Sequence, residues 1–185
     1  SILWQGSIVP TETGWYEFFV HSSNGFSFWI NADGKKASID ETVTGGKERE
    51  KSIRLFLLGG RPYPILLDFF KFKDPVAKVR LSWKPPNGKK EVVPREFLFQ
   101  QSVPPSLIIQ QKLPPDDSSA GFARGTMIEQ AWDEAVTFAA LEAGRFANEK
   151  IDKLAQTKQE DPRRKEKAEE FFLQFVKFAF RQPLT

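Results

Sequence analysis

The fold class is decided by residues 15–30, which read Trp15-Tyr16-Glu17-Phe18-Phe19-Val20-His21-Ser22-Ser23-Asn24-Gly25-Phe26-Ser27-Phe28-Trp29-Ile30. Aromatic and β-branched residues alternate with polar ones on both sides of a central run of small polar residues and glycine. Such alternation is typical of strands with one buried face, and the central run is typical of a turn. The pattern therefore predicts two neighbouring strands joined by a turn at Ser22–Gly25.

The same strand pattern continues to residue 99. Within residues 51–58, Ile53, Leu55 and Leu57 are predicted to point inward, and Phe56 outward. Further strands are predicted at 36–40, 63–72, 77–83, 92–93 and 96–99, with turns at 59–60 and 85–88. About eight strands in roughly 100 residues predict a mainly β fold, an antiparallel β-sandwich or barrel.

The character of the sequence changes after residue 101. Residues 102–120 contain Pro104-Pro105 and Pro114-Pro115 and are predicted to be a linker. Residues 121–185 have helical periodicity and predict a C-terminal helical hairpin. Its first helix would start at the capping box formed by Thr126 and Glu129, and its second at Asp161-Pro162. The predicted domains are thus 1–101, 102–120 and 121–185.

The second predicted helix is apolar around much of its circumference, because Phe171, Phe172, Phe175, Phe178 and Phe180 all lie on it. A helix of this kind needs more partner surface than one hairpin offers. We therefore expect these side chains, Phe175 included, to be buried against the first helix, the β-domain or a neighbouring chain. The hairpin would then be part of a larger helical domain in a longer protein.

Composition excludes several classes of site and partner. The chain has no Cys and one His, so disulfides, Cys-based zinc or iron–sulfur sites and two-His metal sites are impossible. Residues 1–101 carry 15 basic and 11 acidic side chains without a dense basic stripe, so no nucleic-acid partner is expected. No apolar run approaches the roughly 20 residues that cross a bilayer, so no membrane span is expected.

Six sequence blocks appear in an order that resembles the protective-antigen-type ("PA fourteen") β-sandwich over residues 2–100. The blocks are 4–8, 13–18, 23–31, 58–65, 79–83 and 93–99. This family occurs in adhesins, glycosidases and toxins, and many members bind carbohydrate. The resemblance therefore implies a lectin-like, non-catalytic module that binds polysaccharide or glycan as part of a larger protein. The alternative is a structural or protein-interaction spacer that has lost calcium-dependent sugar binding.

The resemblance also indicates candidate carbohydrate-binding residues, namely Ser23, Asn24, Trp29, Asn31 and Asp33. In calcium-dependent members, two adjacent aspartates in one turn hold the ion, and the corresponding positions here are Ser23 and Asn24. These side chains offer only neutral oxygens, whereas calcium prefers a ligand set that includes carboxylates. Calcium is therefore disfavoured as a cofactor, and no metal ligand is predicted.

Three tryptophans leave two readings open. Trp15 or Trp29 could offer a stacking face for a sugar without any metal. The alternative, which the alternation of the strands favours, is that Trp15, Trp29 and Trp83 all pack in the core. Asn24 has a similar alternative, since asparagine before Gly25 is a common turn former.

The helical part resembles a module of planctomycete-type secreted, cytochrome-associated multidomain proteins. The resemblance is carried by 121–125, by Trp132-Asp133-Glu134-Ala135 and by the closing run 178–185. It implies a secreted, periplasmic or cell-envelope location, with other domains of the same parent chain as partners. Haem would belong to those absent domains, because no Cys-x-x-Cys-His motif is present here.

Catalytic patterns are scarce. Asp68 interrupts the apolar run Leu66–Phe70, but an outward-facing strand position accounts for it, and glycoside hydrolysis needs a second carboxylate at a set distance. No Gly-rich phosphate loop or nucleophile elbow is present. We therefore expect no catalytic residue in this chain, although the parent protein could carry redox or hydrolytic domains.

Overall fold

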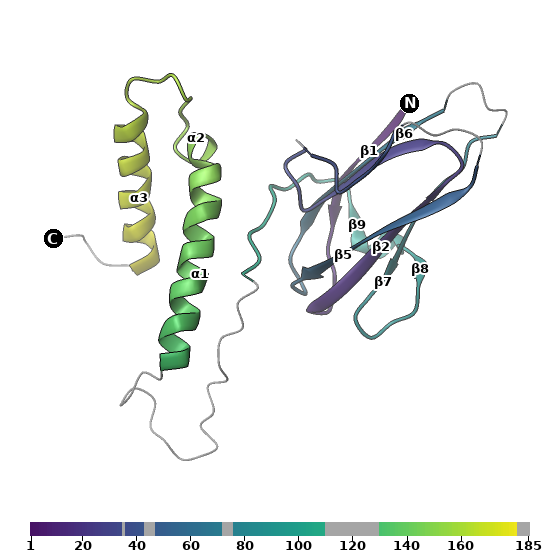
Figure 1. The fold of residues 1–185 in the computed structure, drawn as a ribbon, viewed down its shortest axis with the longest axis horizontal. Coiled ribbons are helices and arrows are strands. Elements are labelled where there is room, and N and C mark those ends of the chain that lie inside the picture. The colour runs from purple at the N-terminus through teal and green to yellow at the C-terminus, as the bar shows by residue number, and fades with distance from the viewer. Residues whose placement is uncertain (35, 43–46, 72–75, 110–129, 181–185) are drawn as a thin grey trace, which may run out of the picture. The chain divides into compact units, whose positions relative to one another are not determined.

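The structure is a computed structural model that describes residues 1–34, 36–42, 47–71, 76–109 and 130–180 (Figure 1). The chain forms two compact units, Ser1–Ile108 and Ile109–Thr185. The first unit is a β-sandwich and the second is helical. This arrangement confirms the predicted fold class.

The sandwich has nine strands in the described residues, and all of their pairings are antiparallel. Sheet A has the order β4-β3-β6-β1-β9, and sheet B has the order β5-β2-β7-β8. The strands of sheet A are β4 (Ile39–Glu41), β3 (Gly25–Ile30), β6 (Tyr63–Phe70), β1 (Ile2–Ile8) and β9 (Leu98–Phe99). Those of sheet B are β5 (Arg49–Leu57), β2 (Gly14–Ser22), β7 (Val79–Lys84) and β8 (Glu91–Val92).

Strands β2 and β3, which the sequence predicted to be neighbours, belong to different sheets. β2 pairs with β5 and β7, whereas β3 pairs with β4 and β6. The turn between them crosses from sheet B to sheet A, so the apolar sides of both strands face one core. Phe18 and Phe28 accordingly meet across the core with their ring centroids 6.3 Å apart. The prediction of a turn was correct, but the prediction of adjacent strands was wrong.

The core lies between the two sheets and is rich in aromatic residues. Its buried members are Ile8, Tyr16, Phe18, Val20, Phe26, Phe28, Ile30, Ile39, Leu57, Tyr63, Leu67, Phe69, Trp83 and Val93. On β5, the predicted inward set is confirmed, since Ile53 and Leu55 pack against this core and Leu57 is fully buried. Phe56 points outward, as predicted, and contacts Trp15 on the outer face of sheet B.

Residues 102–108 have no regular secondary structure, yet they contact the sandwich. Asn31, which follows β3, donates from Nδ2 to the Ser106 carbonyl at 2.9 Å and accepts the Ser106 N–H at 2.8 Å. Ile108 packs against the core. The rest of the predicted linker, 110–120, lies outside the described residues, and the predicted boundaries at 101 and 120 stay predictions.

The helical unit contains α1 (Gln130–Glu149), the short α2 (Ile151–Leu154) and α3 (Arg164–Phe180). The first predicted helix is interrupted at Lys150, after which α2 forms one further turn. Arg164 at the start of α3 donates to Asp152 of α2 at 2.6 Å, so the two segments are linked by an ion pair. The predicted capping box at Thr126 and Glu129 lies outside the described residues.

Asp161 lies three residues before α3, which begins at Arg164 and so two residues later than the predicted start at Pro162. Its Oδ1 accepts the Arg163 N–H at 2.8 Å, and its Oδ2 accepts from Lys167 Nζ at 2.7 Å. The hydrogen bond from Lys167, followed by that from the Arg163 backbone, lowers the pKa of Asp161 from 3.8 to about 2. The charged form of this carboxylate is thus favoured by the folded helix.

This pKa shift predicts a pH dependence for the helical unit. Because the pKa is lower in the folded state, Asp161 adds stability above about pH 4, and this contribution disappears as the pH falls towards 2. Asp161→Asn should therefore destabilise the helices at pH 6 but make no difference near pH 2. Helix melting followed by circular dichroism at both pH values measures this. Lys167→Met should remove most of the same pH dependence; an unchanged dependence would contradict the assigned cause.

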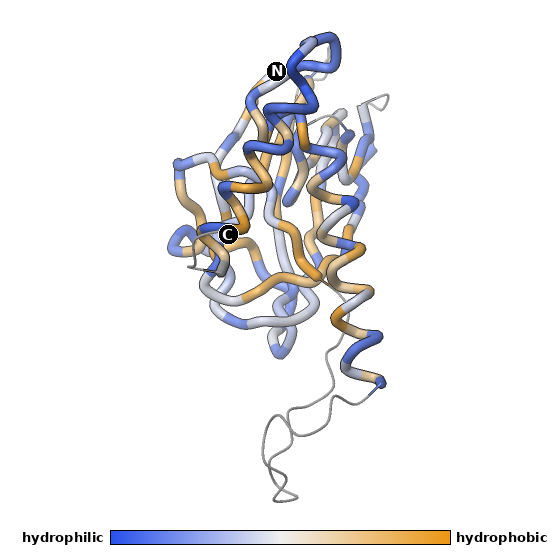
Figure 2. Tube along the Cα trace, turned by 90° about the vertical axis from the view of Figure 1, so that its left-hand side faces the viewer, coloured by the Kyte–Doolittle hydropathy of each residue, from blue (hydrophilic) through white to orange (hydrophobic). Residues whose placement is uncertain are grey.

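Within the described residues, several apolar side chains of α3 stay exposed, so this hairpin does not bury them by itself, and their burial against a neighbouring chain or a larger helical domain stays a prediction. Phe172, Phe175 and Phe178 are 44%, 59% and 82% exposed within the described structure. The reason is geometric, because apolar residues occur around much of the helix and a hairpin covers only one stripe. Figure 2 shows hydrophobic positions recurring along the long helices. None of the described helices is both long enough and apolar enough to span a membrane.

Candidate functional site

The Ser22–Gly25 turn, which holds the first candidate residues, is closed by its own hydrogen bonds. The Ser23 hydroxyl donates to Asn24 Oδ1 at 3.0 Å and accepts the Lys78 N–H at 3.2 Å. The Ser22 hydroxyl shares its hydrogen between the carbonyls of Asn24 (2.9 Å) and Lys78 (3.0 Å) and accepts the Asn24 N–H. Ser22 and Asn24 are buried, so the turn is tied to the residue before β7 and offers little accessible oxygen.

The donor set of this turn does not fit calcium. The side-chain oxygens of Ser23 and Asn24 are neutral and already bonded to each other, and no carboxylate stands beside them in the turn. Calcium takes six to eight oxygen ligands and gains affinity from ligand charge. Nor do the described residues contain a group of three or more His, Cys, Asp or Glu side chains that could hold a metal.

The remaining candidates do not converge with the turn. Asn31 and Asp33 follow the opposite end of β3, roughly 20 Å from Asn24 at strand spacing. Asn31 tethers Ser106, and Asp33 is exposed. Trp29 is half-buried on the outer face of sheet A, and its Nε1 is buried with no hydrogen-bond acceptor among the described atoms.

Of the three tryptophans predicted to pack in the core, only Trp83 does so, and the prediction was wrong for Trp15 and Trp29. Trp83 is buried, as core packing predicted, whereas Trp15 is 45% exposed on the outer face of sheet B. Phe56 meets its ring edge-on at a centroid distance of 5.7 Å, and the Arg54 guanidinium lies over the ring at 5.0 Å. The side chain of Trp15 is therefore held in place by two neighbours on β5 while much of it stays open to solvent.

Polar side chains surround Trp15 on the same face of sheet B. Glu17, two residues further along β2, accepts the Ser52 hydroxyl at 2.8 Å. In the strand register, Glu17 stands between Arg54 of β5 and Lys84 of β7. The surface thus combines one exposed aromatic ring with donors and acceptors, and we call Trp15, Glu17, Ser52, Arg54 and Lys84 the Trp15 platform. Strand alternation alone could have indicated that Trp15 faces outward, because it lies two residues before the outward-facing Glu17 on the same strand.

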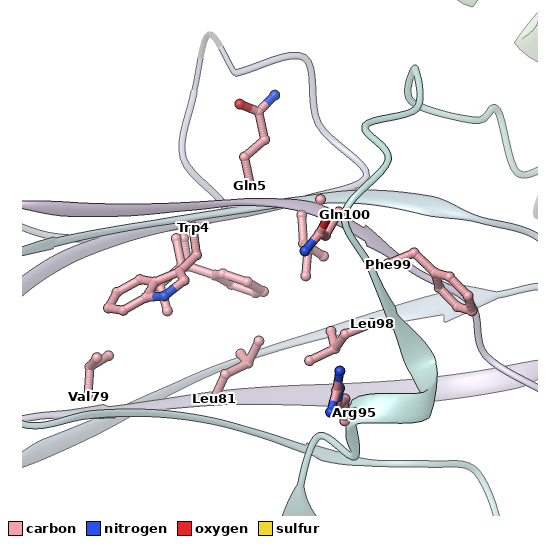
Figure 3. A pocket seen from close by; sticks show the side chains of 12 residues that line it. Trp4, Gln5, Val79, Leu81, Arg95, Leu98, Phe99 and Gln100 are labelled. Atoms are coloured by element: carbon pink, nitrogen blue, oxygen red, sulfur yellow. The ribbon is translucent and has the colours of Figure 1, made fainter.

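A second feature lies between the sheets, where they open beside β1, β9 and β7 (Figure 3). It is a mostly apolar cleft of about 430 Å³. Trp4 is 46% exposed there although it pairs with the core residue Leu67, and its ring lies 6.4 Å from that of Phe69. The sequence analysis did not single out Trp4 or this opening.

Asp68 faces outward, as its strand position predicted. It stands opposite Ser27 in the register of β6 and β3, and Ser27 donates to Asp40 Oδ1 on β4 at 3.1 Å. The Oδ1 atom of Asp68 is buried without a hydrogen-bond partner in the described structure. Asp68 lines neither the cleft nor the Trp15 platform, because it lies on the outer face of sheet A.

Comparison with known proteins identifies the first unit. A curated relative, Anti-sigma-I factor RsgI3 of Acetivibrio thermocellus, is 35% identical over 99 residues, which are 54% of this chain and 15% of the relative. A solved anti-sigma factor domain-containing protein is 34% identical, with a TM-score of 0.49, over 54% of this chain and 33% of that one. A second solved anti-sigma factor domain-containing protein, from Clostridium clariflavum, is 25% identical, with a TM-score of 0.46. This match covers 60% of this chain and 35% of that one.

The similarity thus spans only a small part of the curated relative and about a third of each solved chain. The matched family model ends at residue 96, so the resemblance of residues 121–185 to planctomycete-type helical modules stays a prediction. Because the PA14 domain model matches residues 1–96, about half of the sequence, this chain belongs to the PA14 domain family.

Proposed function

We propose that the β-sandwich is a non-catalytic carbohydrate-binding module that binds polysaccharide at the Trp15 platform without calcium. The observation that carries this proposal is the exposed, braced ring of Trp15 among polar side chains. The module would serve a larger secreted, periplasmic or cell-envelope protein, whose other domains would be its neighbours in the chain.

The chemistry of the platform suits a sugar ring. A pyranose has an apolar face of C–H groups and a rim of hydroxyls that both donate and accept hydrogen bonds. A tryptophan ring can cover the apolar face at low entropic cost, because Phe56 and Arg54 already restrict its rotamer. Glu17 and Ser52 could accept or donate to hydroxyls at the rim, and Lys84 could donate.

The closed Ser22–Gly25 turn supports a sugar site at a different position from the one that calcium-dependent relatives use. Using Asn24 for a sugar or an ion would require breaking the hydrogen bond from Ser23 and exposing a side chain that is 1% accessible. The Trp15 platform needs no such rearrangement, because its ring and polar groups are accessible as they stand.

A protein-interaction or spacer role is the second candidate. It is favoured by the same closed turn, which lacks the carboxylates of calcium-dependent sugar sites, and by the name of the curated relative, an anti-sigma factor. In that case the sandwich would bind no polysaccharide with or without calcium.

The proposal predicts that Trp15→Ala weakens polysaccharide binding by about tenfold, since an aromatic contact contributes up to about 1.5 kcal/mol. Affinity electrophoresis of the full chain through gels containing xylan, pectin or soluble β-glucan measures this, in calcium and in chelator. Trp132→Ala is the matched control, because Trp132 is 44% exposed but lies on α1. Equal retardation of both variants would exclude the platform, and no retardation of the wild type by any polysaccharide would favour the second candidate.

A further inference from the structure

The cleft between the sheets has the dimensions and lining of a small-molecule site. Its volume of about 430 Å³ falls within the range of roughly 300–1,000 Å³ that is usual for such sites. Trp4, Val79, Leu81 and Leu98 point into the same space, with Phe28 among the lining residues (Figure 3). Gln5, also at the cleft, points to the other side of β1, where it donates to Ser102.

The cleft lies beside β1 and β9 at one edge of sheet A. β9 pairs with only the last two residues of β1, Ser7 and Ile8, and so leaves Trp4 without a partner strand on that side. At Gly6, a Cβ atom would lie 2.2 Å from the Phe99 carbonyl oxygen, so only glycine permits the chain after β9 to run this close to β1. Trp4 accordingly stays 46% exposed where it lines the cleft.

One charged side chain lines the cleft. Arg95 lies beside Leu98 in the short 3-10 helix η1 (Arg95–Phe97), and its guanidinium forms no ion pair or hydrogen bond with the described residues. Gln100, also without such a partner in the described structure, adds an amide that can donate. A guanidinium with free donors next to an apolar cavity matches a carboxylate attached to an apolar body.

We infer that this cleft binds an aliphatic monocarboxylate, with its chain against Trp4 and Leu81 and its carboxylate on Arg95. A polysaccharide would suit the cleft poorly, because its hydroxyls would be buried among side chains that offer them few partners. A phosphate ester carries up to two negative charges, and a single guanidinium would neutralise only one of them. The inference does not depend on the proposed function, because the Trp15 platform lies on the outer face of sheet B.

Isothermal titration calorimetry of the full chain with sodium octanoate tests the inference. We expect one saturable site per chain and a loss of affinity of about tenfold or more in Arg95→Gln, because hydrogen bonds to charged groups are among the strongest. Arg61→Gln is the matched control, since Arg61 is exposed in the turn before β6 and does not line the cleft. It should bind octanoate like the wild type.

Two further measurements separate the carboxylate from the apolar contact. 1-Octanol, which lacks the charge, should bind the wild type and Arg95→Gln with equal affinity. That affinity should be lower than the affinity of the wild type for octanoate. Val79→Phe, which fills part of the cleft, should lower the affinity for both octanoate and 1-octanol. Near-ultraviolet circular dichroism checks that this variant keeps the native fold. The inference is overturned if octanoate shows no saturable binding to the wild type, or if Arg95→Gln and Arg61→Gln bind octanoate alike.

Discussion

Phe18→Ala is expected to lower the free energy of unfolding of the β-sandwich by about 3–5 kcal/mol. Phe18 is fully buried, and its ring lies 6.3 Å from Phe28 of the opposite sheet and 6.2 Å from Trp83 of the adjacent strand. Its removal would leave a cavity at the centre of the core, and the surrounding aromatic rings could collapse into that space only in part. Denaturant unfolding followed by near-ultraviolet circular dichroism measures the change.

Phe19→Ala is the matched control on the same strand. Phe19 points to the outer face of sheet B, where Lys90 Nζ lies 4.1 Å from its ring centroid. Phe19 is half-buried there, outside the core, so Phe19→Ala should cost clearly less than Phe18→Ala, and the cation–π contact itself contributes about 0.5–1 kcal/mol. If Phe19→Ala destabilised the sandwich as much as Phe18→Ala, the assignment of the two faces of β2 would be contradicted.

Asn24→Ala should lower the free energy of unfolding by about 1–3 kcal/mol, by the same amount in millimolar calcium and in chelator. The side chain is buried, and its loss removes the acceptor of the Ser23 hydroxyl within the turn that joins the sheets. Since the turn offers calcium no carboxylate, we propose that the ion adds no stability through binding. Thermal melting of the wild type and the variant under both conditions tests this.

Asn87→Ala provides the comparison for that substitution. Asn87 is exposed and donates to Glu12 at 2.9 Å, so its replacement should change stability by no more than about 0.5 kcal/mol. A calcium-induced rise in the melting temperature of the wild type that Asn24→Ala abolished would contradict our view of the turn and restore calcium-dependent sugar binding there.

Much of the sandwich was predictable because the relevant signals are local. On β5 the period of two assigned Ile53, Leu55 and Leu57 to the core and Phe56 to the surface, and the structure confirms all four. The connections at 22–25, 59–60 and 85–88 were predictable too, because the residues that favour a turn lie within the turn itself. Asp161 could be identified as a turn former just before the last helix, because its side chain bonds the backbone only two residues away.

The candidate site was less predictable. The turn residues Ser23 and Asn24 were identified by resemblance, but their mutual hydrogen bond was not. Nor were the hydrogen bonds that join Ser22 and Ser23 to Lys78, 56 and 55 positions along the chain. Trp15, Trp29 and Trp83 look alike in sequence, yet one is exposed, one half-buried and one buried. Whether an aromatic residue is covered depends on which distant segment crosses its face, and periodicity carries no such information.

The sequence by itself determined that this protein has a mainly β first half, a turn at Ser22–Gly25 and helices in its C-terminal part, because backbone propensity, period and turn chemistry act over a few residues. Only the tertiary structure decided that β2 and β3 belong to opposite sheets, that Trp15 stands on an open face and that Trp4 and Arg95 line one cleft. These features depend on how strands far apart in sequence share a single core, which is settled by packing over the whole sandwich rather than by any one segment.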